Sequence, residues 1–126
     1  MTDESLQPLS CAETEILRIV WGLGSGTVQD VCDGLPRQRR IAYATVQTLL
    51  RRLEKKGYVA HDAQGKAHVF KPVALKEQVI RSAVGAFIQR LFGGDAVPLV
   101  MHLAKARKLT LEDVERLKRI IEEEQG

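Results

Sequence analysis

Apolar residues recur at three- and four-residue steps along most of this chain, which is the spacing of helices with one buried side. The first run opens with Ser10 and Glu13 at the spacing of a capping box, and Leu9 precedes them as a hydrophobic staple. Its apolar members are Ala12, Ile16, Leu17, Ile19, Val20 and Leu23. Glycines at positions 22, 24 and 26 mark its end, and Trp21 is expected to close the core.

A second helix is expected to be short, capped by Thr27 and ending near Gly34, before Pro36. The third helix, residues 42–56, carries its apolar residues on one side: Ala42, Val46, Leu49, Leu50 and Leu53. The other side is small and polar at first and basic further along: Ala44, Gln47, Thr48, Arg51, Arg52 and Lys55. Two helices joined by a brief turn, the second with such a side, predict a helix-turn-helix.

A helix of this kind suits the major groove of DNA, where small side chains reach base edges and Arg or Lys hold phosphates. The alternative is a basic side that only faces solvent. Residues 37–71 contain nine Lys or Arg against two acids, net +7, whereas residues 1–36 carry −5 and residues 72–126 carry +1. This concentration of positive charge favours a polyanionic partner.

After Gly57 the pattern changes to alternation over residues 58–62 and again over residues 67–72, with a turn between them. A hairpin near residues 58–71, directly after the basic helix, is typical of a wing, and Lys66 at its tip could reach a phosphate. The predicted fold class is mainly α with a small β-hairpin wing. Residues 1–72 are assigned to a winged helix-turn-helix domain that binds DNA.

Beyond Pro72 the pattern is helical again, with a long amphipathic run ending at glycines 93 and 94 and two shorter helices after it. The last helix opens with Thr110 and Asp113 at capping-box spacing. Residues 73–126 are expected to form a helical dimerisation domain, because so little chain cannot bury all of its apolar faces alone. The expected contacts are Val84, Phe87, Ile88, Leu91, Leu99, Leu103, Leu117, Ile120 and Ile121. The alternative is a monomer in which these helices fold back on the wing domain.

Other chemistry is sparse. Cys11 and Cys32 match no metal-ligand spacing and are expected to be buried and unpaired, with a redox role as the alternative. No signal peptide or membrane span is recognised, so a cytoplasmic protein without membrane insertion is expected. His61 and His68 are expected to be solvated wing residues near DNA, although a facing pair would permit a metal or pH effect. No catalytic constellation or phosphate-binding glycine loop occurs, so neither an enzyme nor a cofactor or metal is expected.

Several spaced motifs resemble the penicillinase and methicillin-resistance repressor family (BlaI/MecI/CopY). They are residues 9–17 (LSCAETEIL), Trp21, residues 27–31 (TVQDV), 41–53 (IAYATVQTLLRRL), 56–59 (KGYV) and 92–94 (FGG). The resemblance spans roughly residues 9–124. It implies a homodimeric repressor whose winged helices bind a palindromic double-stranded operator and whose C-terminal helices interlock.

The resemblance places operator contacts on the start and exposed side of the third helix: Tyr43, Ala44, Thr45, Gln47, Thr48 and Arg51. Of these, Thr48 is expected to contact a base edge or methyl group, and Gln47 could pair with adenine. Phosphate contacts are expected from basic side chains on and around the helix: Arg40, Arg51, Arg52, Lys55 and Lys66.

Two departures from the family pattern concern induction. In β-lactam-responsive members a membrane sensor protease cleaves an Asn-Phe pair, and the aligned pair here is His102-Leu103. Copper-responsive members carry a C-terminal cysteine cluster, which residues 121–126 lack, so copper sensing by that route is excluded.

The expected function is a transcriptional repressor, one that regulates antibiotic resistance in the family's manner. Its release signal is unidentified, with proteolysis of the C-terminal domain as one candidate. The alternative is a winged-helix protein-interaction module without specific DNA binding.

Overall fold

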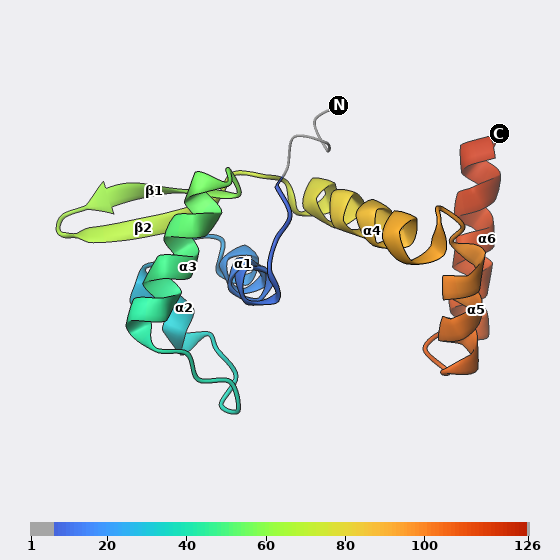
Figure 1. Ribbon diagram of the computed structural model, residues 1–126, viewed down its shortest axis with the longest axis horizontal. Helices are drawn as coiled ribbons and strands as arrows, with labels where there is room; N and C mark the ends of the chain where they lie inside the picture. Colours follow the sequence, from blue (N-terminus) through green and yellow to red (C-terminus); the bar gives the residue numbers. More distant parts are fainter. Residues whose placement is uncertain (1–6, 126) are drawn as a thin grey trace. The chain divides into compact units, whose positions relative to one another are not determined.

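A computed structural model describes residues 7–125, which contain six helices and one hairpin (Figure 1). By their contacts, the residues divide into two compact units, one ending at Ala83 and the other beginning at Val84. The elements are α1 (Cys11–Leu23), α2 (Val28–Asp33), α3 (Tyr43–Lys55), β1 (Val59–Gln64), β2 (Ala67–Pro72), α4 (Lys76–Phe92), α5 (Val97–Lys105) and α6 (Leu111–Gln125). The predicted fold class is confirmed. None of the helices within residues 7–125 is long and apolar enough to cross a membrane.

The helix starts are stabilised by side-chain caps. At α1, the Glu13 N–H donates to Ser10 Oγ (3.1 Å) and the Ser10 N–H donates to Glu13 Oε1 (2.9 Å). The same reciprocal pair joins Thr110 and Asp113 before α6, so both predicted capping boxes are confirmed. Thr27, predicted only as a cap, forms a third box with Asp30 at the start of α2. Each box satisfies amides that have no partner inside the helix.

The core of the first unit lies where α1, α2, α3 and the hairpin meet. It is aliphatic apart from two aromatic rings, and its members are Ile16, Leu17, Val20, Val28, Val31, Val46, Leu49, Leu50, Leu53, Tyr58, Val59, Phe70 and Val79. Because Val79 belongs to α4, the start of that helix is part of this core. The core fixes the angle at which α3 leaves the rest of the unit.

The wing is an antiparallel hairpin in which Val59 pairs with Pro72 and Gln64 with Ala67. A third segment joins it, since Gly26 and Phe70 exchange backbone hydrogen bonds of 2.9 and 2.8 Å. A side chain at Gly26 would approach Asp30 Cβ to 3.0 Å, so glycine permits the close packing of this segment against α2. The hairpin is thereby anchored to the turn before α2.

The expectation that both cysteines are buried is corrected. Cys11 is exposed, contrary to the expectation that it is buried, and Cys32 is partly buried; both thiols are free. Cys11 precedes the buried Glu13 by two helical positions, about 200°, which turns it to the opposite side of α1. Trp21 packs at the edge of the core and is only partly buried, with Lys76 Nζ 5.8 Å from its ring centroid.

The second unit has no buried side chain among residues 84–124. Large apolar side chains are exposed on each of its helices, including Leu91 on α4, Val97 on α5 and Ile120 on α6. Such a concentration of exposed apolar surface marks a region that a single chain does not cover.

Candidate nucleic-acid interface

Helix α3 presents a polar side to solvent because its apolar side is fully used in the core. Val46, Leu50 and Leu53 have no exposed surface, and α3 packs on α1 and α2. The opposite side therefore faces outward. The predicted contact residues on it are exposed, apart from the half-buried Gln47: Tyr43, Ala44, Thr45, Thr48, Arg51, Arg52 and Lys55.

A hollow of about 200 Å³ separates this side of α3 from the wing. Its lining includes four of the predicted contact residues, Tyr43, Gln47 and Arg51 on α3 and Lys66 at the turn of the hairpin. The other predicted contacts do not line it: Arg40, Ala44, Thr45, Thr48, Arg52 and Lys55. The fold thus brings a helix and a hairpin tip together around one concave, basic surface.

Two polar residues that line the hollow carried no predicted contact role of their own, Thr27 and His68. Strand alternation could have placed His68, because it lies two positions before the buried Phe70 and therefore on the same face of the hairpin. No sequence pattern indicated a contact role for Thr27, because its role as a helix cap already explains why a threonine is there.

The hydroxyl of Thr48 is already engaged within α3. Its Oγ1 donates to the carbonyl oxygen of Ala44 at 3.0 Å. The hydroxyl proton is therefore not free for a base, while the oxygen can still accept a hydrogen bond and the methyl group can make apolar contact. Any base contact by Thr48 in this rotamer is as acceptor or through its methyl group.

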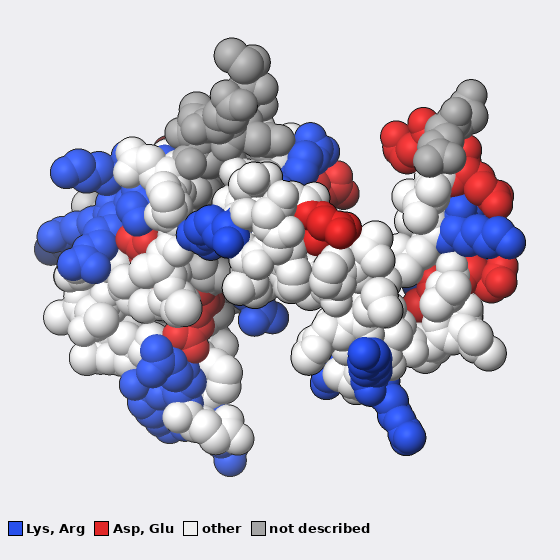
Figure 2. Space-filling model, turned by 45° about the vertical axis from the view of Figure 1, so that its right-hand side comes forward, with Lys and Arg blue, Asp and Glu red and all other residues white. Residues whose placement is uncertain are grey.

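Basic side chains gather in clusters on the surface of the first unit (Figure 2). The loop before α3 contributes Arg37, Arg39 and Arg40, all exposed. Arg39 Nε lies 3.1 Å from both carboxylate oxygens of Glu15, so this arginine also ties the loop to α1. Positive charge therefore surrounds the start of α3 as well as its exposed side.

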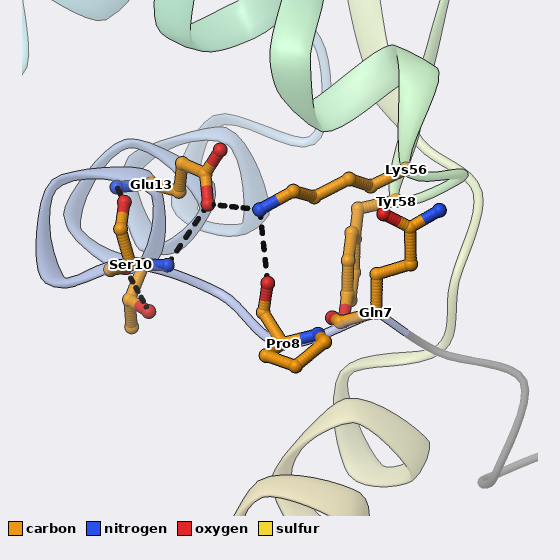
Figure 3. Close-up of polar contacts among 7 residues, drawn as sticks. Gln7, Pro8, Ser10, Glu13, Lys56 and Tyr58 are labelled. Atoms are coloured by element: carbon orange, nitrogen blue, oxygen red, sulfur yellow. Dashed lines mark hydrogen bonds and ion pairs between the residues drawn. The ribbon is translucent and has the colours of Figure 1, made fainter.

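Lys56, which caps the C-terminal end of α3, is held inside the unit (Figure 3). Its Nζ donates to Glu13 Oε1 at 2.6 Å and to the carbonyl oxygen of Pro8 at 2.9 Å. Beside it the Tyr58 hydroxyl donates to the carbonyl oxygen of Gln7. These bonds join the end of α3 to the start of α1, so the Lys56 ammonium is a structural group.

Burial, hydrogen bonds and nearby charges shift the pKa values of Glu13 and Tyr58 in this cluster. Desolvation acts to raise the pKa of Glu13, but the hydrogen bonds from Lys56 and Ser10 and the charge of Lys56 outweigh it and hold that pKa below its ordinary value. Burial, with the nearby charge of Glu13, raises the pKa of the Tyr58 hydroxyl. Glu13 is therefore a carboxylate at neutral pH, and its charge is balanced by Lys56.

A polar contact between Glu54 and His61 joins α3 to the wing. The Glu54 carboxylate accepts from the His61 N–H at 3.1 Å and lies 2.6 Å from His61 Nδ1. The His61 ring stacks on His68, with ring centroids 4.5 Å apart and planes 19° from parallel. No group of three or more His, Cys, Asp or Glu in residues 7–125 is arranged to hold a metal ion.

A helix with an exposed polar side, next to a hairpin and ringed by basic side chains, defines a winged-helix protein of the DNA-binding class. The model of the family described as penicillinase repressor matches residues 9–123. The chain therefore belongs to the penicillinase repressor family, and the resemblance read from its motifs is confirmed.

Individual relatives agree with this assignment. The chain is 27% identical over 120 residues to a penicillinase repressor of Bacillus licheniformis, covering 95% of this chain and 94% of that one. It is 23% identical over 119 residues to the methicillin resistance regulatory protein MecI of Mammaliicoccus sciuri, covering 94% and 97%. The solution structure of monomeric Bacillus licheniformis BlaI in complex with the blaP half-operator matches 58% of this chain and 89% of that chain, at 29% identity and a TM-score of 0.50.

Proposed function

We propose that this protein is a transcriptional repressor that binds a palindromic operator as a homodimer. The observation that carries the proposal is the hollow between α3 and the wing, which joins Gln47 and Arg51 to Lys66 on one exposed surface. A related chain has been solved in complex with a half-operator, which supports DNA as the ligand of this protein too. The cytoplasm is the compartment consistent with this role.

Within this surface we assign two kinds of contact. The start and middle of α3 would enter the major groove and contact bases: Tyr43, Ala44, Thr45, Gln47 and Thr48. Basic side chains around them would hold phosphates: Arg40, Arg51, Arg52, Lys55 and Lys66. The first set would select the site, and the second would add affinity that depends on salt.

The assignment is tested by comparing Thr48→Ala with Arg52→Ala on two duplexes, the intergenic DNA beside the protein's own gene and a random duplex of equal length. Thr48→Ala should weaken binding to the intergenic DNA alone, by about 1–3 kcal/mol if the base contact is good. Arg52→Ala should weaken binding to both duplexes. It should also reduce the slope of log affinity against log salt concentration by about one. Arg18→Ala is the matched control, since it removes the same charge from an exposed position of the same unit but on α1, outside the proposed DNA-binding surface.

Equal loss on both duplexes would refute the base-contact role of Thr48. A purely sequence-selective effect of Arg52→Ala would refute its phosphate role. The rival function, a winged helix that binds only protein, predicts no salt-dependent affinity for either duplex, so the same titration at two salt concentrations separates the two functions.

Dimerisation through the second unit is supported by its uncovered apolar surface. The residues proposed to meet a second copy are Val84, Phe87, Ile88, Leu91, Leu99, Leu103, Leu117, Ile120 and Ile121, all of them exposed or only partly buried. Leu117→Asp should shift sedimentation from dimer to monomer. Arg119→Asp, about 200° further around α6, should not. A dimer that survives Leu117→Asp unchanged would contradict this interface.

Release from the operator could follow cleavage within the second unit by a sensor protease. The pair His102-Leu103 lies inside α5, so a protease would need that helix to open locally. Mass spectrometry of the protein recovered from cells before and after β-lactam treatment tests this route. A new fragment ending at His102 would support it, and an intact chain alongside derepressed transcription would exclude it.

A further inference from the structure

The wing contains a stacked histidine pair that DNA binding through α3 leaves unexplained. His68 lies on β2 and lines the hollow with Gln47, Arg51 and Lys66. Its ring stacks on that of His61 from β1, which is not its directly paired neighbour, since His61 pairs with Phe70 in the strand register. A stacked ring on the inner wall of a proposed DNA-binding surface is within reach of the same ligand as its neighbours.

Glu54 positions this pair from α3. Its carboxylate lies 2.6 Å from His61 Nδ1 and also accepts the backbone N–H of His61 at 3.1 Å. A ring nitrogen that faces a carboxylate at this distance carries a hydrogen, which orients the His61 ring. The side chains of His61 and Glu54 are each about one third exposed, at 34% and 32%. His61 therefore has a fixed anionic partner, and His68 stacks on a ring that is already held in place.

The charged side chains that line the hollow with His68 are cations. Arg51 on α3 and Lys66 at the turn are both cations on the lining of the same hollow. The ring of His61 stacks on the ring of His68, and the Glu54 carboxylate is engaged by His61.

The carboxylates on the neighbouring elements are engaged with other groups. The carboxylate of Asp30 at the start of α2 accepts the Thr27 N–H at 2.9 Å. On the hairpin, Asp62 pairs with Lys71 at 3.1 Å. Tyr43, which also lines the hollow, bears a phenol. No carboxylate is among the residues that line the hollow, so the anion that would face a charged His68 has to come from the ligand.

We propose that His68 is a further DNA-contacting residue, and that it takes up a proton when a backbone phosphate enters the hollow. This inference rests on the proposed function. A phosphate beside Arg51 and Lys66 reverses the local balance of charge, because the imidazolium then faces an anion. His61 and Glu54 act as positioning residues that hold the His68 ring at the wall of the hollow.

The consequence is a repressor whose affinity rises as pH falls. When the bound state holds one more proton than the free state, affinity changes up to tenfold per pH unit in the range where the group titrates. For an imidazole this range is centred near about pH 6.5. Binding should therefore strengthen between pH 8 and pH 6, on the operator and on random DNA alike, because the contact is to phosphate.

The experiment measures the affinity of the full-length protein for the intergenic duplex and a random duplex from pH 6 to pH 8 at constant ionic strength. The wild-type protein should bind more tightly at low pH, by at most about tenfold per unit. His68→Gln should remove most of this dependence. His68→Lys, with a permanent charge, should remove it too while keeping tight binding at pH 8. His61→Phe, which preserves a stacked ring, should keep the dependence, as should the control His102→Gln in the second unit.

A wild-type affinity that does not change with pH would overturn the proposal, as would pH dependence that persists in His68→Gln. If only His61→Phe removed the pH dependence of DNA affinity, the proton would be bound by His61, and the proposal would also be overturned. A protein that binds neither duplex at any pH would overturn the proposed function together with this inference, whereas pH-independent binding would overturn only the inference.

Discussion

The ion pair between Lys56 and Glu13 offers a sharp test of how α3 is held. Lys56→Met keeps the length of the side chain but removes its charge, and leaves Glu13 without the partner that balances it. The Glu13 side chain is 3% exposed and that of Lys56 is 24% exposed. The expected result is a large loss of stability with little change in the salt dependence of DNA binding, because Lys56 faces α1 and does not line the hollow.

The magnitude follows from the burial of the pair. Removing one partner of a buried pair typically costs about 3–5 kcal/mol, whereas an exposed pair contributes about 0–1 kcal/mol. Since Lys56 keeps some contact with solvent, we expect Lys56→Met to cost about 2–3 kcal/mol. A double-mutant cycle with Glu13→Gln should give a coupling energy of about 1.5–3 kcal/mol, the range for hydrogen bonds to charged groups.

Chemical denaturation followed by the fluorescence of Trp21 is the assay, because this single tryptophan lies in α1 and reports on the first unit. The matched control is the pair between Arg39 and Glu15, at 3.1 Å with side chains 55% and 28% exposed. The double-mutant cycle of this control pair should give a coupling energy below about 1 kcal/mol. A coupling for Lys56 and Glu13 no larger than that of the control would refute the reasoning from burial.

The pH dependence of the effect has a definite sign. The pKa of Glu13 is lowered in the folded protein from an ordinary value of 4.5, so its ionised form contributes stability that is present above about pH 4.5 and is lost as pH falls through the folded pKa. Without Lys56, burial acts against that ionised form. The difference in unfolding free energy between wild type and Lys56→Met should be largest at neutral pH and shrink in acid. A difference that grows in acid would contradict this account.

Three further predictions concern other parts of the chain. Gly57 has φ of +90° with no atom within 4 Å of the position that a Cβ would occupy, so Gly57→Ala should cost about 1–2 kcal/mol in denaturation through backbone strain alone. A chain ending at Ala83 should melt at a higher temperature than one ending at Pro72, because the shorter chain lacks Val79, whose burial is worth about 1.5–3 kcal/mol. A thiol reagent followed by mass spectrometry should modify the exposed Cys11 before Cys32, since burial and the charge of Asp33 raise the pKa of the Cys32 thiol; faster reaction at Cys32 would contradict this.

Local features of the sequence determined much of this protein. The capping boxes at Ser10 and Thr110, the amphipathic period of α3 and the alternation of the hairpin were all readable, because each depends on residues close together in the chain. The spaced motifs also sufficed to recognise the family, which the match over residues 9–123 confirmed. Burial of the core face of α3 then exposed the polar side that periodicity had identified.

The tertiary structure decided which of the polar residues are available. Lys56 belongs to the basic helix by composition, yet it is held by Glu13, 43 residues earlier. His61 and His68 stack because the hairpin register brings them together, and Glu54 meets His61 only because the wing folds back on α3. The hairpin pattern already allowed a facing histidine pair, but the contacts of Glu13 with Lys56 and of Glu54 with His61 join residues whose separation in the chain carries no periodic signal. The sequence determined where the polar side of α3 lies, and only the fold decided which charges hold the protein together and which face its ligand.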